Sequence, residues 1–224
     1  MKISFINSVA QICERVGADV MQVAEGMGLD RRIGRAFLDA GVGYGGYCFP
    51  KDVAAFIRIA ERQGVDFQLL KATEAVNAQQ RQRLVQRVAH ALWNLSNKTI
   101  AVLGLSFKPD TDDLREAPSI EVIRMLRQEG ARIRAFDPKA MAQAKSLLPG
   151  VTFCKSAYEA VRGADCLVLM TEWNEFKELE FTRIKKLMRQ PLVVDGRNLY
   201  QSDTLQRLGF RYIGVGRGEP WDQR

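Results

Sequence analysis

Through about the first 93 residues, apolar side chains recur every three or four positions, the spacing that lets a helix bury one face. In the first stretch this apolar face consists of Ile3, Ile6, Val9, Ala10, Cys13 and Val16. Gly17, a residue type that commonly ends helices, predicts the end of this helix. The same spacing predicts further helices over 19–27, 31–38, 52–64 and 69–92. Residues 1–93 are therefore expected to form an all-helical domain.

After residue 93, short apolar runs bounded by turn residues replace the helical spacing. Strands are predicted over 99–105, 131–136, 165–170, 192–194 and 212–215. Helices are predicted between them over 119–129, 139–148, 156–162 and 176–188. This alternation is typical of a parallel sheet with helices on both faces. The expected fold class is α/β, with a helical domain followed by a Rossmann-like, doubly wound domain over 94–224, and the helix over 69–92 connects the two.

The net charge of +7 and the isoelectric point of about 9.4 raise the question of a polyanionic partner. The basic residues are spread along the chain and are not interleaved with aromatic residues on one element, as a nucleic-acid-binding surface would require. Solvated helix faces explain most of them, and a small anionic ligand such as a diphosphate explains the rest better than a polymer does. No nucleic-acid partner is expected.

The sequence also predicts the compartment. No run of about 18 or more apolar residues occurs, so neither a transmembrane helix nor a membrane partner is expected. The first residues, Met1 to Asn7, lack the pattern of a signal peptide. A cytoplasmic location, in which cysteines stay reduced, is therefore the expectation.

Four cysteines occur, and they form no C-x-x-C pair and adjoin no histidine, so no metal site is expected. Cys13 and Cys166 lie in apolar stretches and are expected to be buried. Cys154 lies at a predicted strand end and is also interpreted as structural. Only Cys48 has surroundings that favour chemistry.

Cys48 follows the densest glycine cluster of the chain, residues 41–46, and precedes Lys51 and Asp52. A thiolate is a strong nucleophile, but it needs a neighbouring cation or base. Lys51 offers a cation and Asp52 a carboxylate, and the dipole of the following helix favours a thiolate just before its N-terminus. From spacing alone, the alternative is a tight turn with a buried cysteine, in which Asp52 only caps the helix.

The loop over 104–116 directly follows the first predicted strand, the position at which a doubly wound domain binds its ligand. Lys108 and Arg115 in this loop could hold phosphates or a carboxylate. Gly104 is its only glycine, so the loop is not a dinucleotide-binding fingerprint. Its aspartates could equally be plain loop formers.

Two further arginines are candidate ligands. Arg197 follows the predicted strand 192–194 and would project from the same carboxyl edge of the sheet, although a surface salt bridge explains it as well. Arg32 lies in the predicted helix 31–38, where a solvated face is the simpler interpretation.

Taken together, these segments resemble the UDP-glucose/GDP-mannose dehydrogenase family over nearly the whole chain. The segments similar to its central helical domain are 3–8, 17–20, 30–34 and 41–46. Residues 48–52, Cys-Phe-Pro-Lys-Asp, resemble its active-site signature, and residues 107–116 and 195–197 resemble its C-terminal sugar-nucleotide domain. Tyr47 departs from the pattern, because the family usually has serine before the cysteine.

The resemblance implies an NAD-dependent, four-electron oxidation of the 6-hydroxyl of a nucleotide sugar to a carboxylate. Cys48 would form a thiohemiacetal and then a thioester, and Asp52 would act as a general base. The implied substrate-binding residues are Arg32, Phe37, Leu38, Tyr44, Gly45, Phe49, Phe107, Lys108 and Arg197. Among these, Arg32 would reach the substrate of a neighbouring subunit. Lys51 and Arg115 would contact NAD.

Within the family, residues 30–34 and 41–46 favour UDP-glucose as the substrate over GDP-mannose and UDP-N-acetyl sugars. The family also has an N-terminal NAD-binding domain that this sequence does not contain, so the chain is expected to be a fragment that is inactive alone. A homodimer is implied through the first helix, with its apolar face of Ile3, Ile6, Ala10 and Cys13 at the interface. The alternative from another class is a non-catalytic sugar-nucleotide-binding or dimerisation module.

Overall fold

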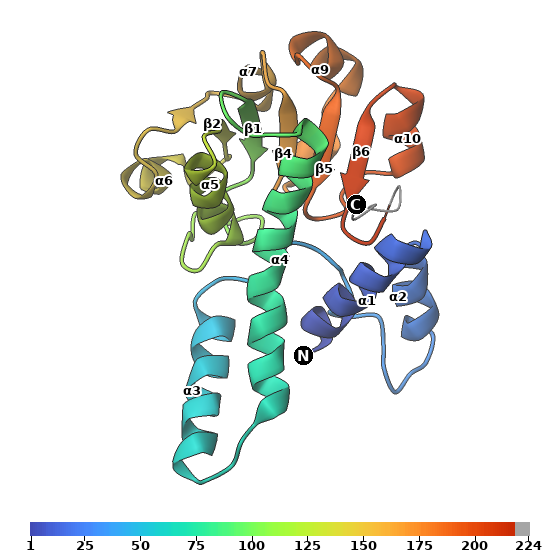
Figure 1. Ribbon diagram of the computed structural model, residues 1–224, viewed down its shortest axis with the longest axis vertical. Coiled ribbons are helices and arrows are strands. Elements are labelled where there is room, and N and C mark those ends of the chain that lie inside the picture. Colours follow the sequence, from blue (N-terminus) through green and yellow to red (C-terminus); the bar gives the residue numbers. More distant parts are fainter. Residues whose placement is uncertain (218–224) are drawn as a thin grey trace.

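The computed structural model describes residues 1–217 and has two parts, a group of helices and a sheet with helices on both faces (Figure 1). The helices of the first part are α1 (Lys2–Val16), α2 (Val20–Gly28), α3 (Cys48–Arg62) and α4 (Gln68–Leu92). Both α1 and α3 pack on α4, which continues as one long helix to the sheet (Figure 1). None of the helices in the described part of the chain is both long enough and apolar enough to cross a membrane.

The second part is built on one parallel sheet in the order β3-β2-β1-β4-β5-β6. Its strands are β1 (Thr99–Leu103), β2 (Arg132–Phe136), β3 (Thr152–Phe153), β4 (Cys166–Leu169), β5 (Leu192–Asp195) and β6 (Arg211–Gly214). This is the strand order of a doubly wound Rossmann sheet, which binds ligands at its carboxyl edge where the order reverses. The predicted fold class, helices followed by a Rossmann-like α/β sheet, is confirmed.

Side chains alternate between the two faces of the sheet, and both faces are buried. Ile100 and Val102 of β1 point to the face that α4 covers, together with α5 (Pro118–Gln128) and α6 (Met141–Leu147). Ala101 and Leu103 point to the opposite face. The helices there are α7 (Ala157–Val161), α9 (Phe181–Leu187) and α10 (Ser202–Arg207). The central strands β1, β4 and β5 therefore consist of nearly continuous apolar residues, whereas β2 alternates apolar residues with Arg132 and Arg134.

The two parts share residues at their junction. Leu84, Val85 and Val88 on the C-terminal half of α4 belong to the core of the sheet. In return, Val215, which follows β6, packs in the core formed by α1 and α2. The core of the sheet part thus begins inside α4, before the boundary expected at residue 93.

Residues 31–38 do not form the predicted helix, and this prediction is wrong. The segment is a series of turns in which Gly34 and Phe37 have positive φ angles of 68° and 66°. Leu38 is buried between α1 and α2, whereas Phe37 is exposed. The apolar residues of this segment therefore point to different sides of a loop, although their spacing in the sequence is that of one face of a helix.

The helix predicted over 176–188 is two helices, α8 (Asn174–Lys177) and α9. Phe176, Phe181 and Ile184 all enter the same core. Because five positions separate the first two, one continuous helix would place them on different sides, so the chain turns between them. Two short elements, β3 and α10, were given no predicted range, although Cys154, which directly follows β3, was expected at a strand end; β3 has two residues and α10 buries a single side chain.

The α1 face predicted for a dimer interface is mostly buried inside the chain, so that assignment is wrong. Ile6, Ala10 and Cys13 pack against α2 and Val215. The large apolar residues that α1 exposes lie on a different side of the helix and are Phe5, Ile12 and Val16. Because α1 carries apolar residues on two faces, the sequence pattern did not distinguish the inner face from the outer one.

Candidate active site

The glycine-rich segment over 41–46 crosses from the helices to the carboxyl edge of the sheet, and polar contacts hold it on both sides. On the helical side, the Asn77 side chain accepts a hydrogen bond from Tyr44 N at 2.8 Å and donates one to Tyr44 O at 3.1 Å. Asn7 Oδ1 accepts from Gly41 N at 2.8 Å. On the sheet side, Val42 N donates to Gly196 O at 2.8 Å. The segment is therefore fixed between the two parts.

Close packing explains the glycines of this segment better than dinucleotide binding does. Gly41, Gly43 and Gly46 have the spacing of a dinucleotide-binding loop, but no strand precedes them. A Cβ on Gly45 would lie 2.1 Å from the carbonyl oxygen of Glu116. Gly43 has a φ of 98°, and its Cβ would lie 2.5 Å from Asn77 Oδ1. The glycines thus let the segment approach the loop over 104–116 and α4.

Cys48 is the first residue of α3, so the prediction that this helix begins at Asp52 is wrong by one turn. Pro50 is compatible with this position because the first helical turn requires no N–H donor. Cys48 is a free, exposed thiol, whereas the other three cysteines are buried as predicted. Burial raises the pKa of the Cys13 thiol and of the Cys154 thiol, which makes both poor nucleophiles. Cys48 is the accessible thiol of the described residues.

Two ion pairs lie next to Cys48. Lys51 Nζ is 3.3 Å from an Asp52 carboxylate oxygen, and both side chains are exposed. Arg115 binds Asp113 at 2.7 Å. The hydrogen bond that Lys51 donates to Asp52 is the largest cause that raises the pKa of Lys51, and the hydrogen bond that Arg115 donates to Asp113 is the largest cause that raises the pKa of Arg115. Within residues 1–217, no hydrogen bond joins Asp52 to Cys48, so the structure brings the predicted base near the thiol without pairing them.

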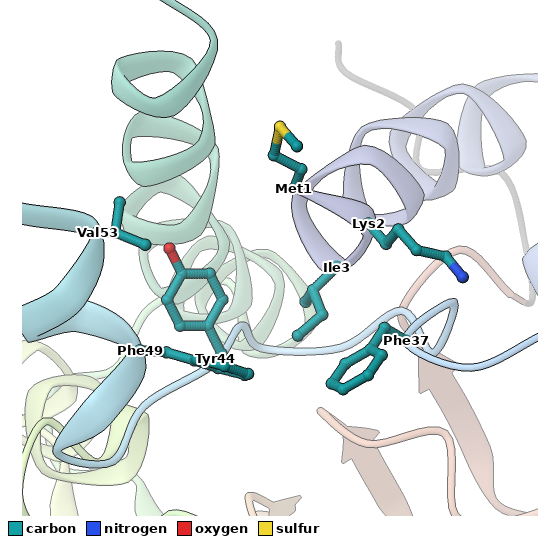
Figure 2. A pocket seen from close by; sticks show the side chains of 7 residues that line it. All are labelled: Met1, Lys2, Ile3, Phe37, Tyr44, Phe49 and Val53. Atoms are coloured by element: carbon teal, nitrogen blue, oxygen red, sulfur yellow. The ribbon is translucent and has the colours of Figure 1, made fainter. Parts of the chain in front are cut away.

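Beside this segment lies a mainly apolar cavity of about 360 Å³ (Figure 2). Its lining residues are Met1, Lys2, Ile3, Phe37, Tyr44, Phe49 and Val53. The Phe49 ring lies 6.3 Å from that of Phe37 and 6.0 Å, edge-on, from that of Tyr44. Burial is the largest cause that raises the pKa of Tyr44, so its hydroxyl stays protonated. The Lys2 ammonium points away from Tyr44 and donates to Ile33 O and Gly34 O.

Arg197 lies where the sheet edge meets the glycine-rich segment. Its guanidinium donates to Met170 O at 2.9 Å and to Gly43 O at 3.0 Å, and it lies 3.3 Å from Glu172. Burial lowers the pKa of Arg197, and the charge of Glu172 opposes this effect. A second cavity of about 320 Å³ opens beside it. Asp195 positions the arginine, since its carboxylate accepts from Arg197 N at 2.9 Å.

The remaining predicted ligands differ in their surroundings. Phe107 lies against Gly46, and the Lys108 ammonium is exposed, 5.4 Å from the centre of the Phe107 ring. Arg32 is almost fully exposed and forms a two-pronged ion pair with Asp30. Leu38 is only 1% exposed, so its side chain is not available, and any ligand contact would come from its backbone.

Sequence reasoning missed Asn77 and Asn7. Asn77 lies on the buried side of α4, seven positions from both Leu70 and Leu84, which are buried too. A polar residue at an apolar position of a helix is therefore the signal that would have identified it.

The sheet itself does not fit a dinucleotide. In NAD-binding Rossmann domains, an acidic residue about 20 positions beyond the glycine loop binds the ribose. Here Asp137, at the end of β2, is buried, and one of its oxygens accepts from Leu105 N at 2.6 Å and Trp173 Nε1 at 3.2 Å. Its other oxygen accepts from Ala140 N at 2.7 Å. This carboxylate is therefore used to hold the loop after β1 and the start of α6.

Comparison with known proteins agrees with this geometry. Residues 1–79 match the central domain of the UDP-glucose/GDP-mannose dehydrogenase family, and residues 101–202 match the UDP-binding domain of the same family.

Individual relatives match along almost the whole chain. The UDP-glucose 6-dehydrogenase TuaD of Bacillus subtilis is 46% identical over 217 residues, which are 96% of this chain and 47% of that protein. The UDP-glucose 6-dehydrogenase of Rhizobium meliloti is 47% identical over 97% of this chain and 50% of its own length. A UDP-glucose dehydrogenase structure from Pyrobaculum islandicum superposes with a TM-score of 0.87 at 37% identity, over 97% of this chain and 48% of that one. The chain thus spans about half the length of these relatives.

Proposed function

The chain belongs to the UDP-glucose/GDP-mannose dehydrogenase family, and from this premise we propose that it provides the substrate-binding and nucleophile-bearing half of an NAD-dependent UDP-glucose 6-dehydrogenase. The observation that carries the proposal is the position of Cys48. It is an exposed thiol at the start of a helix, on a segment held between Asn77 and the Arg197 edge of the sheet. A nucleophile and a phosphate-binding edge are thereby part of one site.

The substrate is proposed to bind across this segment. Arg197 and Lys108 supply positive charge for the diphosphate. The cavity lined by Phe37, Tyr44 and Phe49, the residue after Cys48, would take the sugar. Arg32 is exposed and is proposed to reach the substrate of a neighbouring subunit.

The chemistry follows from the thiol. Once the 6-hydroxyl has been oxidised to an aldehyde, the Cys48 sulfur adds to the carbonyl carbon, and the carbonyl oxygen takes up a proton to give a thiohemiacetal. A second two-electron oxidation gives a thioester. Water then breaks the C–S bond, which releases the carboxylate and returns the thiol. Asp52, exposed near the thiol, would accept the proton of that water. When bound, NAD accepts the hydride of each oxidation, and Lys51 and Arg115 are the cations that would contact it.

Because the sheet fits no dinucleotide, we propose that this chain alone reduces no NAD. We also propose a cytoplasmic homodimer. The exposed apolar stripe of Phe5, Ile12 and Val16 on α1 is the surface that would be buried between its subunits.

A calorimetric titration of the chain with UDP-glucose, and with GDP-mannose for comparison, tests the proposal. UDP-glucose is expected to bind, GDP-mannose more weakly, and Arg197→Ala to remove most of the affinity. Because Arg197 is largely buried, the exposed Lys108→Ala provides a second variant that does not threaten folding. Arg207→Ala, an exposed arginine on α10, is the matched control. Preference for GDP-mannose, or binding unaffected by both variants, would contradict the proposal.

A further inference from the structure

Tyr47 lies directly before Cys48, at the N-cap position of α3, and its side chain is 48% exposed. Two cations approach its ring. The Arg115 guanidinium carbon is 4.4 Å from the ring centroid, and Lys51 Nζ is 4.9 Å from it. Both distances are within the range of a cation–π interaction. One aromatic side chain therefore contacts both cations next to the free thiol.

The two cations come from different parts of the chain, and this gives Tyr47 a bridging role. Lys51 belongs to the first turns of α3, whereas Arg115 belongs to the loop that follows β1. Beside the ring, Gly46 N donates to Arg115 O at 3.0 Å, which fixes the backbone of the two segments against each other. Lys51 also pairs with Asp52, and Arg115 with Asp113, so the ring adds a second restraint that the two cations share.

Electrostatics supports the proximity of these groups to sulfur. The pKa of Lys51 is raised first by Asp52 and to a smaller extent by Tyr47 and by the charge of Cys48. The pKa of Arg115 is raised first by Asp113, and again Tyr47 and Cys48 contribute. The charged groups around the thiol are thus Lys51 and Asp52 on α3 and Asp113 and Arg115 on the loop. The nearest arginine of α4, Arg81, is paired with Glu121.

We propose that Tyr47 is a positioning residue, whose ring holds Lys51 and Arg115 beside Cys48 so that anionic groups are attracted to the thiol. The inference rests on the proposed role of Cys48 as the nucleophile. The hydroxyl of Tyr47 is not required, whereas the aromatic face is.

Alkylation of Cys48 tests this role without any substrate, because the other three cysteines are buried. The rate is measured by site-resolved mass spectrometry at one fixed pH of about 8, where thiols in general react. Tyr47→Ser removes the ring, and Tyr47→Phe keeps it. The matched control is Tyr158→Ser, which removes the stack of Arg183 on Tyr158 at 4.1 Å, far along the sequence from Cys48.

Two reagents distinguish the effect of local charge on the alkylation rate from the effect of access to the thiol. Iodoacetate is anionic and iodoacetamide is neutral, and because the two have similar size, only the attraction by the cations differs between them. The ratio of their rates is expected to fall about two- to fivefold in Tyr47→Ser, the effect of a cation–π interaction of ordinary strength. Tyr47→Phe and Tyr158→Ser are expected to keep the rate ratio of the unaltered chain.

An unchanged ratio in Tyr47→Ser would overturn the inference, even if access to the thiol and therefore both rates increase. A loss in Tyr47→Phe equal to that in Tyr47→Ser would also overturn it, because the hydroxyl would then carry the effect. Failure of the proposed function has a different signature. The chain would not bind UDP-glucose in the titration above, while the alkylation ratio would still respond to Tyr47→Ser.

Discussion

The two parts of the chain bury different kinds of side chain. Between α1 and α4 the buried residues include many polar ones, namely Ser4, Asn7, Glu14, Thr73, Asn77, Gln80 and Arg87. In the sheet part the core is apolar, and its three buried aspartates, Asp137, Asp165 and Asp195, lie at the ends of strands. Paired polar groups thus contribute to the contact between α1 and α4, whereas buried apolar side chains hold the helices on the two faces of the sheet.

Glu14 is the centre of the helical contact. Its carboxylate pairs with Arg87 and, at 2.8 Å, with Arg83, and it accepts from Gly216 N at 2.8 Å. Burial lowers the pKa of Arg87 to about 10, so the guanidinium is still charged at neutral pH, and the carboxylate must offset its desolvation. Apolar packing tolerates many shapes, but such a cluster tolerates only one arrangement of α1, α4 and the end of β6. The difference suggests that the helical part depends on specific pairing and the sheet on packing volume.

Removing Glu14, the centre of the contact between α1 and α4, should give the largest loss of stability of the three changes. Glu14→Ala leaves two arginines without their buried carboxylate and is expected to lower the free energy of unfolding by about 3–5 kcal/mol. Urea titration with pulsed alkylation measures this by region, since Cys13 reports the helical core and Cys166 the sheet core. Cys13 should become labelled at lower urea than Cys166. Equal loss of stability in the exposed control Glu25→Ala would contradict this account.

A cavity in the sheet should give a somewhat smaller loss and a different labelling pattern. Leu167 in β4 is fully buried, so Leu167→Ala is expected to cost about 3 kcal/mol through lost apolar contacts and the cavity left behind. Cys154 and Cys166 should lose protection together, and the exposed Leu29→Ala should change neither. If Cys13 alone were affected, the assignment of separate cores would be wrong.

The contact between the glycine-rich segment and α4 should be the least costly of the three to remove. Asn77→Ala deletes two hydrogen bonds to Tyr44 and is expected to destabilise the chain by about 1–3 kcal/mol. Amide hydrogen exchange at Tyr44 should accelerate, while exchange in β1 should stay slow. Asn174→Ala, at an exposed asparagine, is the control. Unchanged exchange at Tyr44 would show that Asn77 does not hold this segment.

This contrast also explains how much of the fold could be predicted. Apolar runs such as Ile100 to Leu103 form strands because both faces of the sheet are buried. Such a run can be recognised from a few consecutive residues of the sequence. The turns over 31–38 were not visible, because Phe37 has a positive φ that its neighbours in space impose. The division of α8 from α9 likewise depends on which core Phe176 and Phe181 share.

Some residues of the candidate site could also be predicted from the sequence, and others could not. Cys48, its glycines and Arg197 were identified because their residue types are unusual in their positions and because they resemble a family signature. Asn7 and Asn77 were not identified; the spacing of Asn77 from Leu70 and Leu84 places it on the buried side of α4, but only the packing shows that its side chain holds Tyr44. Tyr47 was noted only as a departure from a pattern, and its contacts with two cations required the three-dimensional arrangement.

The bond between Glu14 and Gly216 also bears on how the chain is made. It joins residues 202 positions apart, and Val215 beside it fills the core of the first two helices. During synthesis, α1 and α2 leave the ribosome long before Val215 and Gly216 exist, so their apolar core stays open and Glu14 lacks one of its hydrogen bonds. At about 5–20 residues per second, that interval lasts on the order of ten seconds or more. The core of α1 and α2 is therefore completed only after all six strands of the sheet have been made.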